Sequence, residues 1–153
     1  MKYIIMKGFF AILFISFSVA AFSQDPVRWT YKAVKAGNKK YTVQLSAIIQ
    51  PGWHLYSQQQ PADAIALPTD ITFLKNPLIQ LKGNIREKGA MQKYKDETLG
   101  VEAYQYSGEV DFVQDVQLKA GVKTNLSGTV TYQVCTDEKC LPPKTTTFSI
   151  QLE

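Results

Sequence analysis

The sequence predicts an all-β fold, an antiparallel β-sandwich in a single domain. Three observations carry this prediction. Apolar and polar residues alternate in short segments, turn signals such as Pro51-Gly52 and Asn76-Pro77 separate these segments, and no stretch has a convincing helical period. About eight short strands with turns between them are typical of an antiparallel sandwich rather than a parallel sheet. We find no internal repeat and no sign of a second domain.

The first 23 residues are expected to be a secretory signal peptide. Lys2 and Lys7 give a positive start, residues 8–22 are apolar apart from two serines, and Ala21-Phe22-Ser23 is a plausible cleavage site before Gln24. A membrane anchor is the competing interpretation, but the apolar run is short for a span of ~20 residues. We therefore expect an exported domain over residues 24–153 with no membrane span after cleavage.

The charge of the chain points to no particular partner class. The formal net charge is +4, and loss of Lys2 and Lys7 with the signal peptide leaves +2. So small and scattered an excess gives no argument for nucleic acid or for an acidic surface.

The first half of the domain contains clear strand signals. Alternation over 27–33 and 41–49 predicts two strands on either side of the Gly37-Asn38 turn. Further strands are expected in short segments that follow turn signals: 53–56, 71–73 and 78–81. Residues 58–68 are polar with two prolines and are expected to be a loop.

The second half begins with the least strand-like part of the chain. Residues 85–100 are rich in charge and have no clean period, so a short helix, a long loop and a ragged hairpin all remain open. Strand character then returns in segments separated by Ser107-Gly108 and Ala120-Gly121: 101–112, 116–118, 126–134 and 148–152.

One stretch near the C-terminus, TYQVCTDEKCLPPK at 131–144, holds the only two cysteines, Cys135 and Cys140. Val134 and the apolar residues that alternate before it are expected to face the core, so Cys135 should point the other way, toward the surface or a covering loop. Residues 136–139 are polar or charged, and a Pro-Pro pair cannot donate to a sheet, which predicts a loop around Cys140.

Two cysteines this close are expected to form a disulfide in an oxidising compartment when geometry permits. A bridge across so short a loop contributes only about 2 kcal/mol in the chain-entropy model. The spacing therefore leaves two interpretations open, a structural bridge and a redox-active one.

Two motifs together resemble a known family. The stretch VCTDEKCLPP and the earlier PGWHLYSQ at 51–58 are similar to the N-terminal periplasmic domain of the thiol:disulfide interchange protein DsbD. The resemblance implies an immunoglobulin-like β-sandwich in the periplasm that uses no cofactor. It also implies a domain that takes electrons from a membrane-bound partner and passes them to oxidised exported proteins.

The resemblance also implies roles for particular residues. Cys135 and Cys140 match the active cysteine pair, and Cys140 matches the cysteine that forms mixed disulfides with partners. The cap loop that shields the pair matches Asp96, Glu97, Thr98 and Leu99. Here the chain departs from members that place an aromatic side chain over the disulfide, and its cysteine spacing is one residue shorter than in some members.

The sequence ends soon after the cysteine stretch, so we expect the electron donor to be a separate protein, either thioredoxin-like or a DsbD-type membrane protein. Asp96 or Glu97 is a candidate proton relay; the alternative is an ordinary exposed acidic loop.

Two residues of the PGWHLYSQ motif are candidates to flank the disulfide. His54, the lone histidine, has a pKa suited to tuning a thiol, although a plain strand residue is the simpler interpretation. Tyr56 is the second candidate, whereas Trp53 is expected in the core. Near Cys140, lysines favour the thiolate and acidic residues oppose it, so the sequence leaves the acidity of the thiol open.

The leading hypothesis is a thiol:disulfide exchange domain, an oxidoreductase, in which Cys140 attacks, Cys135 resolves and residues 96–99 gate access. The rival is a non-catalytic exported binding module with a structural disulfide. A metal carrier is a third, weaker hypothesis, since two cysteines, one distant histidine and Met91 do not make up a zinc or copper site.

Overall fold

The computed structural model describes residues 25–64, 66–96 and 100–153. These residues form nine strands and no helix. The strands are β1 (Val27–Gly37), β2 (Lys40–Ile49), β3 (His54–Tyr56), β4 (Asp70–Phe73), β5 (Ile79–Asp96), β6 (Val101–Leu118), β7 (Thr124–Tyr132), β8 (Val134–Cys135) and β9 (Lys144–Leu152). The expected signal peptide, residues 1–23, lies outside the described residues. Within the described residues, no helix is long and apolar enough to cross a membrane.

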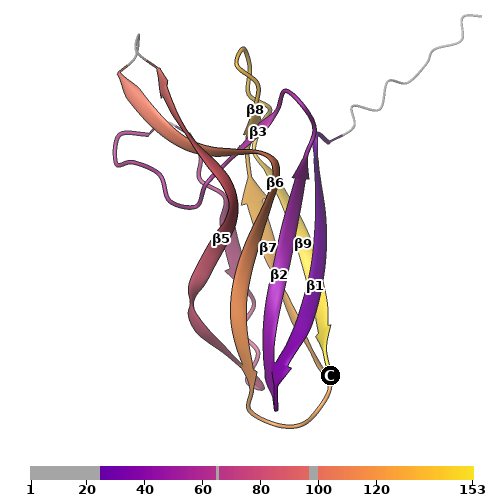
Figure 1. Cartoon of the computed structure of the whole chain (residues 1–153). Helices are drawn as coiled ribbons and strands as arrows, with labels where there is room; N and C mark the ends of the chain where they lie inside the picture. The colour runs from indigo at the N-terminus through magenta and orange to yellow at the C-terminus, as the bar shows by residue number, and fades with distance from the viewer. Residues whose placement is uncertain (1–24, 65, 97–99) are drawn as a thin grey trace, which may run out of the picture.

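The strands form two antiparallel sheets that pack face to face (Figure 1). The larger sheet has the order β1-β2-β6-β3-β8, with β5 paired to the other edge of β6, and the smaller sheet has the order β4-β7-β9. Both β2 and β3 pair with β6, β2 with residues 109–117 and β3 with Gln105 and Tyr106. The short strands β3 and β8 therefore extend the larger sheet at one end of the molecule, opposite the C-terminus (Figure 1).

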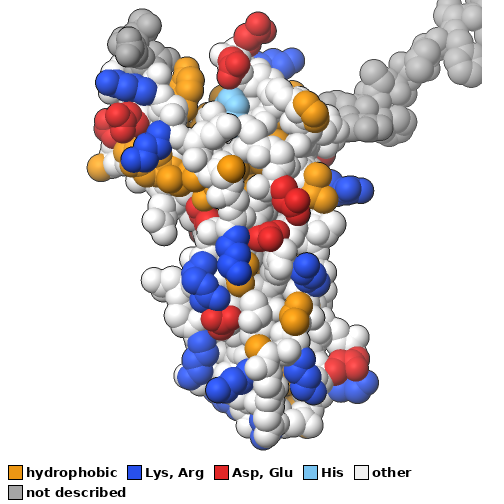
Figure 2. All heavy atoms as spheres, in the orientation of Figure 1, with side chains coloured by type: hydrophobic (Ala, Val, Ile, Leu, Met, Phe, Trp, Pro, Cys, Tyr) orange, Lys and Arg blue, Asp and Glu red, His pale blue; other side chains and the backbone are white. Residues whose placement is uncertain are grey.

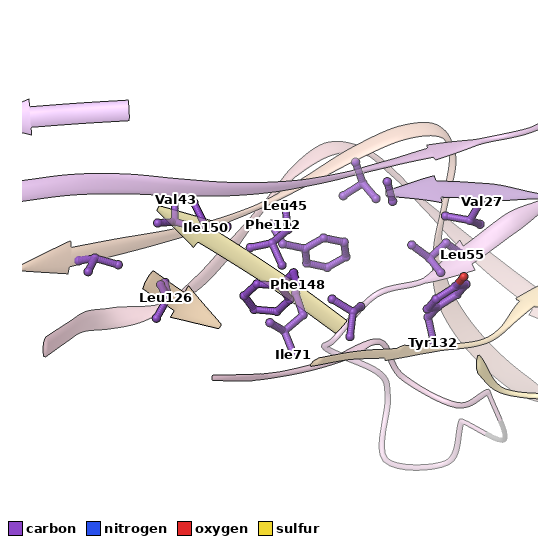
Figure 3. Close-up of a cluster of buried hydrophobic side chains, with 14 of the residues drawn as sticks. Val27, Val43, Leu45, Leu55, Ile71, Phe112, Leu126, Tyr132, Phe148 and Ile150 are labelled. Carbon is purple, nitrogen blue, oxygen red and sulfur yellow. The ribbon is translucent and has the colours of Figure 1, made fainter. Parts of the chain in front are cut away.

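The core lies between the two sheets (Figure 3). Every second residue of β2 is buried there, as alternation predicts, and side chains of β6, β7 and β9 meet them from both sides. Aromatic rings of β1 close one flank, with the Trp29 ring 5.7 Å from Phe112 and 5.4 Å from Tyr132 between centroids. The predicted antiparallel sandwich is confirmed.

The segment with no clear pattern, residues 85–100, is strand rather than helix up to Asp96 in the described residues. It forms most of β5, an 18-residue strand that makes a long hairpin with the 18-residue β6. The register shifts twice, between Lys82 and Arg86 and between Gly89 and Met91. Of the three open interpretations, the ragged hairpin is therefore the right one. The expected break at Ser107-Gly108 does not end β6, because Gly108 takes a left-handed φ of 78° within the strand.

One glycine lies where the neighbouring strands of the smaller sheet leave no room for a side chain. Gly128 of β7 pairs with Phe73 on one side and with Phe148 on the other. A Cβ atom there would lie 2.3 Å from the Thr72 carbonyl oxygen and 2.6 Å from Cζ of Phe148. Any residue with a side chain at position 128 would therefore clash with β4 and β9.

A carboxylate ties the start of the domain to the strands that flank the cysteines. Asp25 accepts hydrogen bonds from the Val27 N–H at 3.0 Å and the Tyr132 hydroxyl at 2.6 Å, and it forms an ion pair with Lys144. Burial alone would raise the pKa of Asp25, but the hydrogen bonds from Lys144, Tyr132 and Val27 outweigh it and hold the pKa below its usual 3.8. The ionised form of Asp25 therefore stabilises the fold.

We expect Asp25→Asn to lower the free energy of unfolding by about 1–2 kcal/mol at pH 7, because hydrogen bonds to a charged acceptor are lost. Since the folded pKa is depressed, this contribution is present above the ordinary pKa and disappears as the pH falls through the folded value. Urea unfolding at pH 7 and at pH 3 checks both points, with exposed Asp63→Asn as the control. An equal loss at the two pH values would contradict the role of the charge.

Candidate functional site

The two cysteines lie in a small hairpin where the chain changes sheets. Strand β7 belongs to the smaller sheet, and after Gln133 the chain enters β8, which pairs with β3 of the larger sheet. The hairpin then turns back, so that Cys135 and Cys140 face each other as an isolated antiparallel pair. They are joined by a disulfide, with Cα atoms 4.0 Å apart.

Hydrogen bonds on either side of the disulfide fix the hairpin. The Thr136 N–H donates to the Lys139 carbonyl at 2.8 Å, and the Leu141 N–H donates to the Val134 carbonyl at 2.9 Å. The turn is tightened by the Thr136 hydroxyl oxygen, which accepts hydrogen bonds from the N–H groups of Glu138 and Lys139. These hydrogen bonds therefore fix the position of the disulfide within a short hairpin.

The two cysteines differ sharply in exposure. Cys135 is 1% exposed, whereas Cys140 is exposed together with residues 137–139 of the turn. The prediction that Cys135 points away from the core, toward the surface or a covering loop, agrees with its place outside the core cluster, but Cys135 does not reach the surface. Although Val134 belongs to the core cluster and Cys135 does not, Cys135 is enclosed because β3 pairs with it on one side and Cys140 on the other.

His54 lies beside Cys135 in the sheet. The two residues are directly opposed in the β3–β8 pairing, so their side chains share the face away from the core. His54 is 8% exposed, and burial lowers its pKa, although the negative charge of Asp137 offsets part of this effect. The imidazole is therefore neutral at neutral pH. The histidine side chain, pale blue in Figure 2, lies at the end of the molecule that carries the cysteine hairpin.

Tyr56 follows on the same face of β3. Its ring makes an edge contact with His54, with centroids 5.8 Å apart. Burial raises the pKa of the Tyr56 hydroxyl, and the neighbouring Tyr94 of β5 raises it further. The structure thus brings together the candidate residues Cys135, His54 and Tyr56. It adds Tyr94 from the β5–β6 hairpin. Trp53, expected in the core, packs against it.

A hydrogen-bonded carboxylate links β5 to the segment after β3. Glu87 of β5 accepts hydrogen bonds from the Ser57 hydroxyl at 2.6 Å, the Gln58 N–H at 2.6 Å and the Tyr106 hydroxyl at 2.7 Å. Burial, followed by the bond to Glu87, raises the pKa of Tyr106. Sequence reasoning missed Glu87, because it lies in the segment without a pattern; the only available signal was the Ser57-Gln58 pair in the PGWHLYSQ motif.

Of the predicted cap loop, only Asp96 is described in the structure. Asp96 ends β5 opposite Val101 of β6, while Glu97, Thr98 and Leu99 lie outside the described residues. The β5–β6 hairpin rises at the same end of the molecule as the cysteine hairpin (Figure 1). The gating roles of these four residues, and the relay role of Asp96 or Glu97, remain predictions.

No three histidine, cysteine, aspartate or glutamate residues in the described ranges are arranged to hold a metal ion.

Comparison with known proteins gives a consistent result. A family model described as the N-terminal part of thiol:disulfide interchange protein DsbD matches residues 21–152. The solved N-terminal domain of DsbD from Neisseria meningitidis, in its reduced form, is 19% identical, with a TM-score of 0.50 over 80% of this chain and 83% of that chain.

The N-terminal periplasmic domain of ScsB from Proteus mirabilis is also 19% identical, with a TM-score of 0.50 over 82% of this chain and 44% of that chain. The complex of the DsbD and PilB N-terminal domains from Neisseria meningitidis has 17% identity and a TM-score of 0.46 over 79% and 80% of the two chains. No curated protein matches the sequence. The likeness to the DsbD domain and to the ScsB domain, each with a TM-score of 0.50, confirms the immunoglobulin-like sandwich.

Proposed function

The chain belongs to the family of N-terminal domains of the thiol:disulfide interchange protein DsbD, and from this membership we propose that it passes reducing equivalents between proteins through the Cys135–Cys140 pair. The observation that carries the proposal is the unequal exposure of the two joined cysteines. A partner can reach Cys140, while Cys135 is enclosed at 1% exposure and is available only to its neighbour. This asymmetry separates an attacking cysteine from a resolving one.

The reaction has two steps. In the reduced domain, the Cys140 thiolate attacks one sulfur of a partner disulfide, and the second partner sulfur leaves as a thiolate. Cys135 then attacks Cys140, reforms the intramolecular bridge and releases the partner with two thiols. The neutral imidazole of His54 is opposite Cys135 and is suited to accept the proton of its thiol, which supports a role for His54 in the second step.

The partners follow from the chemistry of the cycle. Once Cys135 and Cys140 are oxidised, a dithiol donor must reduce them again, and we propose a thioredoxin-like protein or a DsbD-type membrane protein in this role. The acceptors are oxidised exported proteins, and the cycle takes place in the periplasm. In this scheme Asp96 to Leu99 restrict access to the pair until a partner docks, and Tyr56 flanks the disulfide.

The reduction potential of the Cys135–Cys140 pair tests the proposal. We expect a value between about −270 and −180 mV, the range from thioredoxin to protein disulfide isomerase, within which the pair can exchange electrons with other proteins. Equilibration of residues 24–153 with thiol buffers, followed by alkylation of free thiols, gives this value. A potential well below about −300 mV would mark an inert bridge and would favour a non-catalytic binding module.

A further inference from the structure

The main-chain N–H and C=O groups of Cys140 lie at one edge of the cysteine hairpin. The pair Cys135–Cys140 is flanked by the two hydrogen bonds Thr136 N–H to Lys139 and Leu141 N–H to Val134, which is the pattern of a non-hydrogen-bonded antiparallel pair. In such a pair the N–H and C=O groups of each residue point away from the other. Those of Cys140 therefore point outward, and within the described residues they have no hydrogen-bond partner.

The edge that carries the outward groups of Cys140 is short, and it allows a paired strand only one register. Alternation turns the main-chain groups of Leu141 inward, where its carbonyl also accepts a hydrogen bond from the Gln133 side chain at 3.1 Å. The next outward residue is Pro142, which has no N–H to donate. Between Lys139 and Pro143, Cys140 thus supplies the single outward N–H donor of this edge, and both Cys140 and Pro142 are exposed.

We propose that an acceptor protein binds by adding an extended segment to this edge, antiparallel to residues 139–142, with its reactive cysteine opposite Cys140. This inference rests on the proposed exchange function and names the kind of segment that the same site accepts. Main-chain hydrogen bonds give such strand addition its affinity, and the single donor fixes its register.

Two features of sheet geometry support this arrangement. Residues that exchange both main-chain hydrogen bonds have Cα atoms about 5.5 Å apart. This separation falls in the preferred range of about 5.5–6 Å for disulfides. Directly opposed side chains also share one face of a sheet. Cys135, Cys140 and the partner cysteine would therefore form a row across three strands.

The row suits the chemistry of both steps. The Cys140 thiolate attacks the partner sulfur beside it, the partner disulfide breaks, and the departing sulfur takes a proton from water. In the resulting mixed disulfide, Cys135 lies on the opposite side of Cys140 from the partner sulfur. Its thiolate can attack Cys140 in line with the bond that breaks, so that the partner leaves with two thiols and the domain loses two electrons.

A cavity beside the edge offers a place for one neighbouring side chain. It has a volume of about 250 Å³ and is lined by Tyr132, Val134, Leu141 and Pro142, with Asp25, Pro26 and Lys144 completing it. The residue that precedes the partner cysteine would be opposite Leu141 and would lie on the face of this cavity. An apolar side chain is therefore favoured at that position.

Synthetic peptides test the inference on the Cys135→Ala domain, whose Cys140 is a free thiol. The parent probe is a seven-residue linear peptide with a central cysteine carrying thionitrobenzoate, and release of this group is followed by its colour. A second probe is N-methylated at the cysteine, which removes the N–H that would donate to the Cys140 carbonyl. The matched control is N-methylated at the following residue, whose N–H would point away from Cys140.

We expect the second probe to react about tenfold more slowly than the parent and the control probe to react like the parent, since a main-chain hydrogen bond is lost in the second probe only. In the parent adduct, the Cys140 amide should exchange hydrogen at least about tenfold more slowly than in the free domain. Equal rates for all three probes, or equal slowing of both methylated probes, would overturn the strand-addition model while leaving exchange intact. Failure of Cys140 to form a mixed disulfide with any probe would instead refute the exchange function itself.

Discussion

Replacing Cys140 with alanine is expected to lower the rate of mixed-disulfide formation with a protein disulfide by more than about a hundredfold, because the remaining thiol of Cys135 is enclosed. Cys135→Ala should have the opposite effect on the product. Its Cys140 still attacks, but nothing resolves the mixed disulfide, which therefore accumulates. Non-reducing electrophoresis of each reduced variant after mixing with an oxidised protein separates the two outcomes.

The two alanine variants control for each other. Both lose the same bridge between residues five apart in sequence, so each should lose a similar free energy of unfolding, about 2 kcal/mol in the chain-entropy model. A difference in trapping between them then reflects the role of the thiol and not a difference in folding. Trapping through Cys135 at a rate equal to that of Cys140 would reverse the assignment of roles.

Gly128→Ala is expected to be strongly destabilising, with a loss of about 3 kcal/mol or more in the free energy of unfolding. The added methyl group would lie 2.3 Å from the Thr72 carbonyl oxygen, which is backbone and cannot move without separating β4 from β7. Urea unfolding monitored by tryptophan fluorescence measures the loss as a shift of the midpoint.

Gly121→Ala is the matched control for this substitution. A Cβ atom at Gly121 would meet only the Lys39 side chain, at an ordinary distance of 3.7 Å. We expect a change within about 0.5 kcal/mol there, as for most surface positions. An effect of Gly128→Ala as small as that of Gly121→Ala would mean that β4 and β9 can shift apart around β7 at little cost.

The parts of the fold that face the core were predictable from the sequence. Strands β2 and β7 are half-buried, so every second residue of these strands is apolar, and the pattern is visible in the chain. The resemblance to the DsbD family, which depended on the residues around Cys135 and His54, is confirmed by the family match. The two motifs lie side by side in the structure, because β3 and β8 are directly paired.

The parts that were missed have a physical cause in common. Along β5, nearly all of the residues described between 86 and 95 are exposed, so no alternation marks them as strand. The enclosure of Cys135 depends on β3, which is distant in sequence, and on the change of sheets at Gln133. The bonds from Ser57, Gln58 and Tyr106 to Glu87 likewise join segments whose proximity only the tertiary structure provides.

The contrast between local and distant contacts around the cysteines bears on the order of events during folding. The bridge closes between residues five positions apart, whereas the Asp25–Tyr132 contact beside it joins residues 107 positions apart. Closing a short loop takes tens of nanoseconds, while all-β domains with many distant contacts fold in about milliseconds to seconds. The two thiols therefore meet many times in the unfolded chain before the sandwich forms. Oxidation of the pair need not wait for folding, and folding then encloses Cys135 and leaves Cys140 in reach.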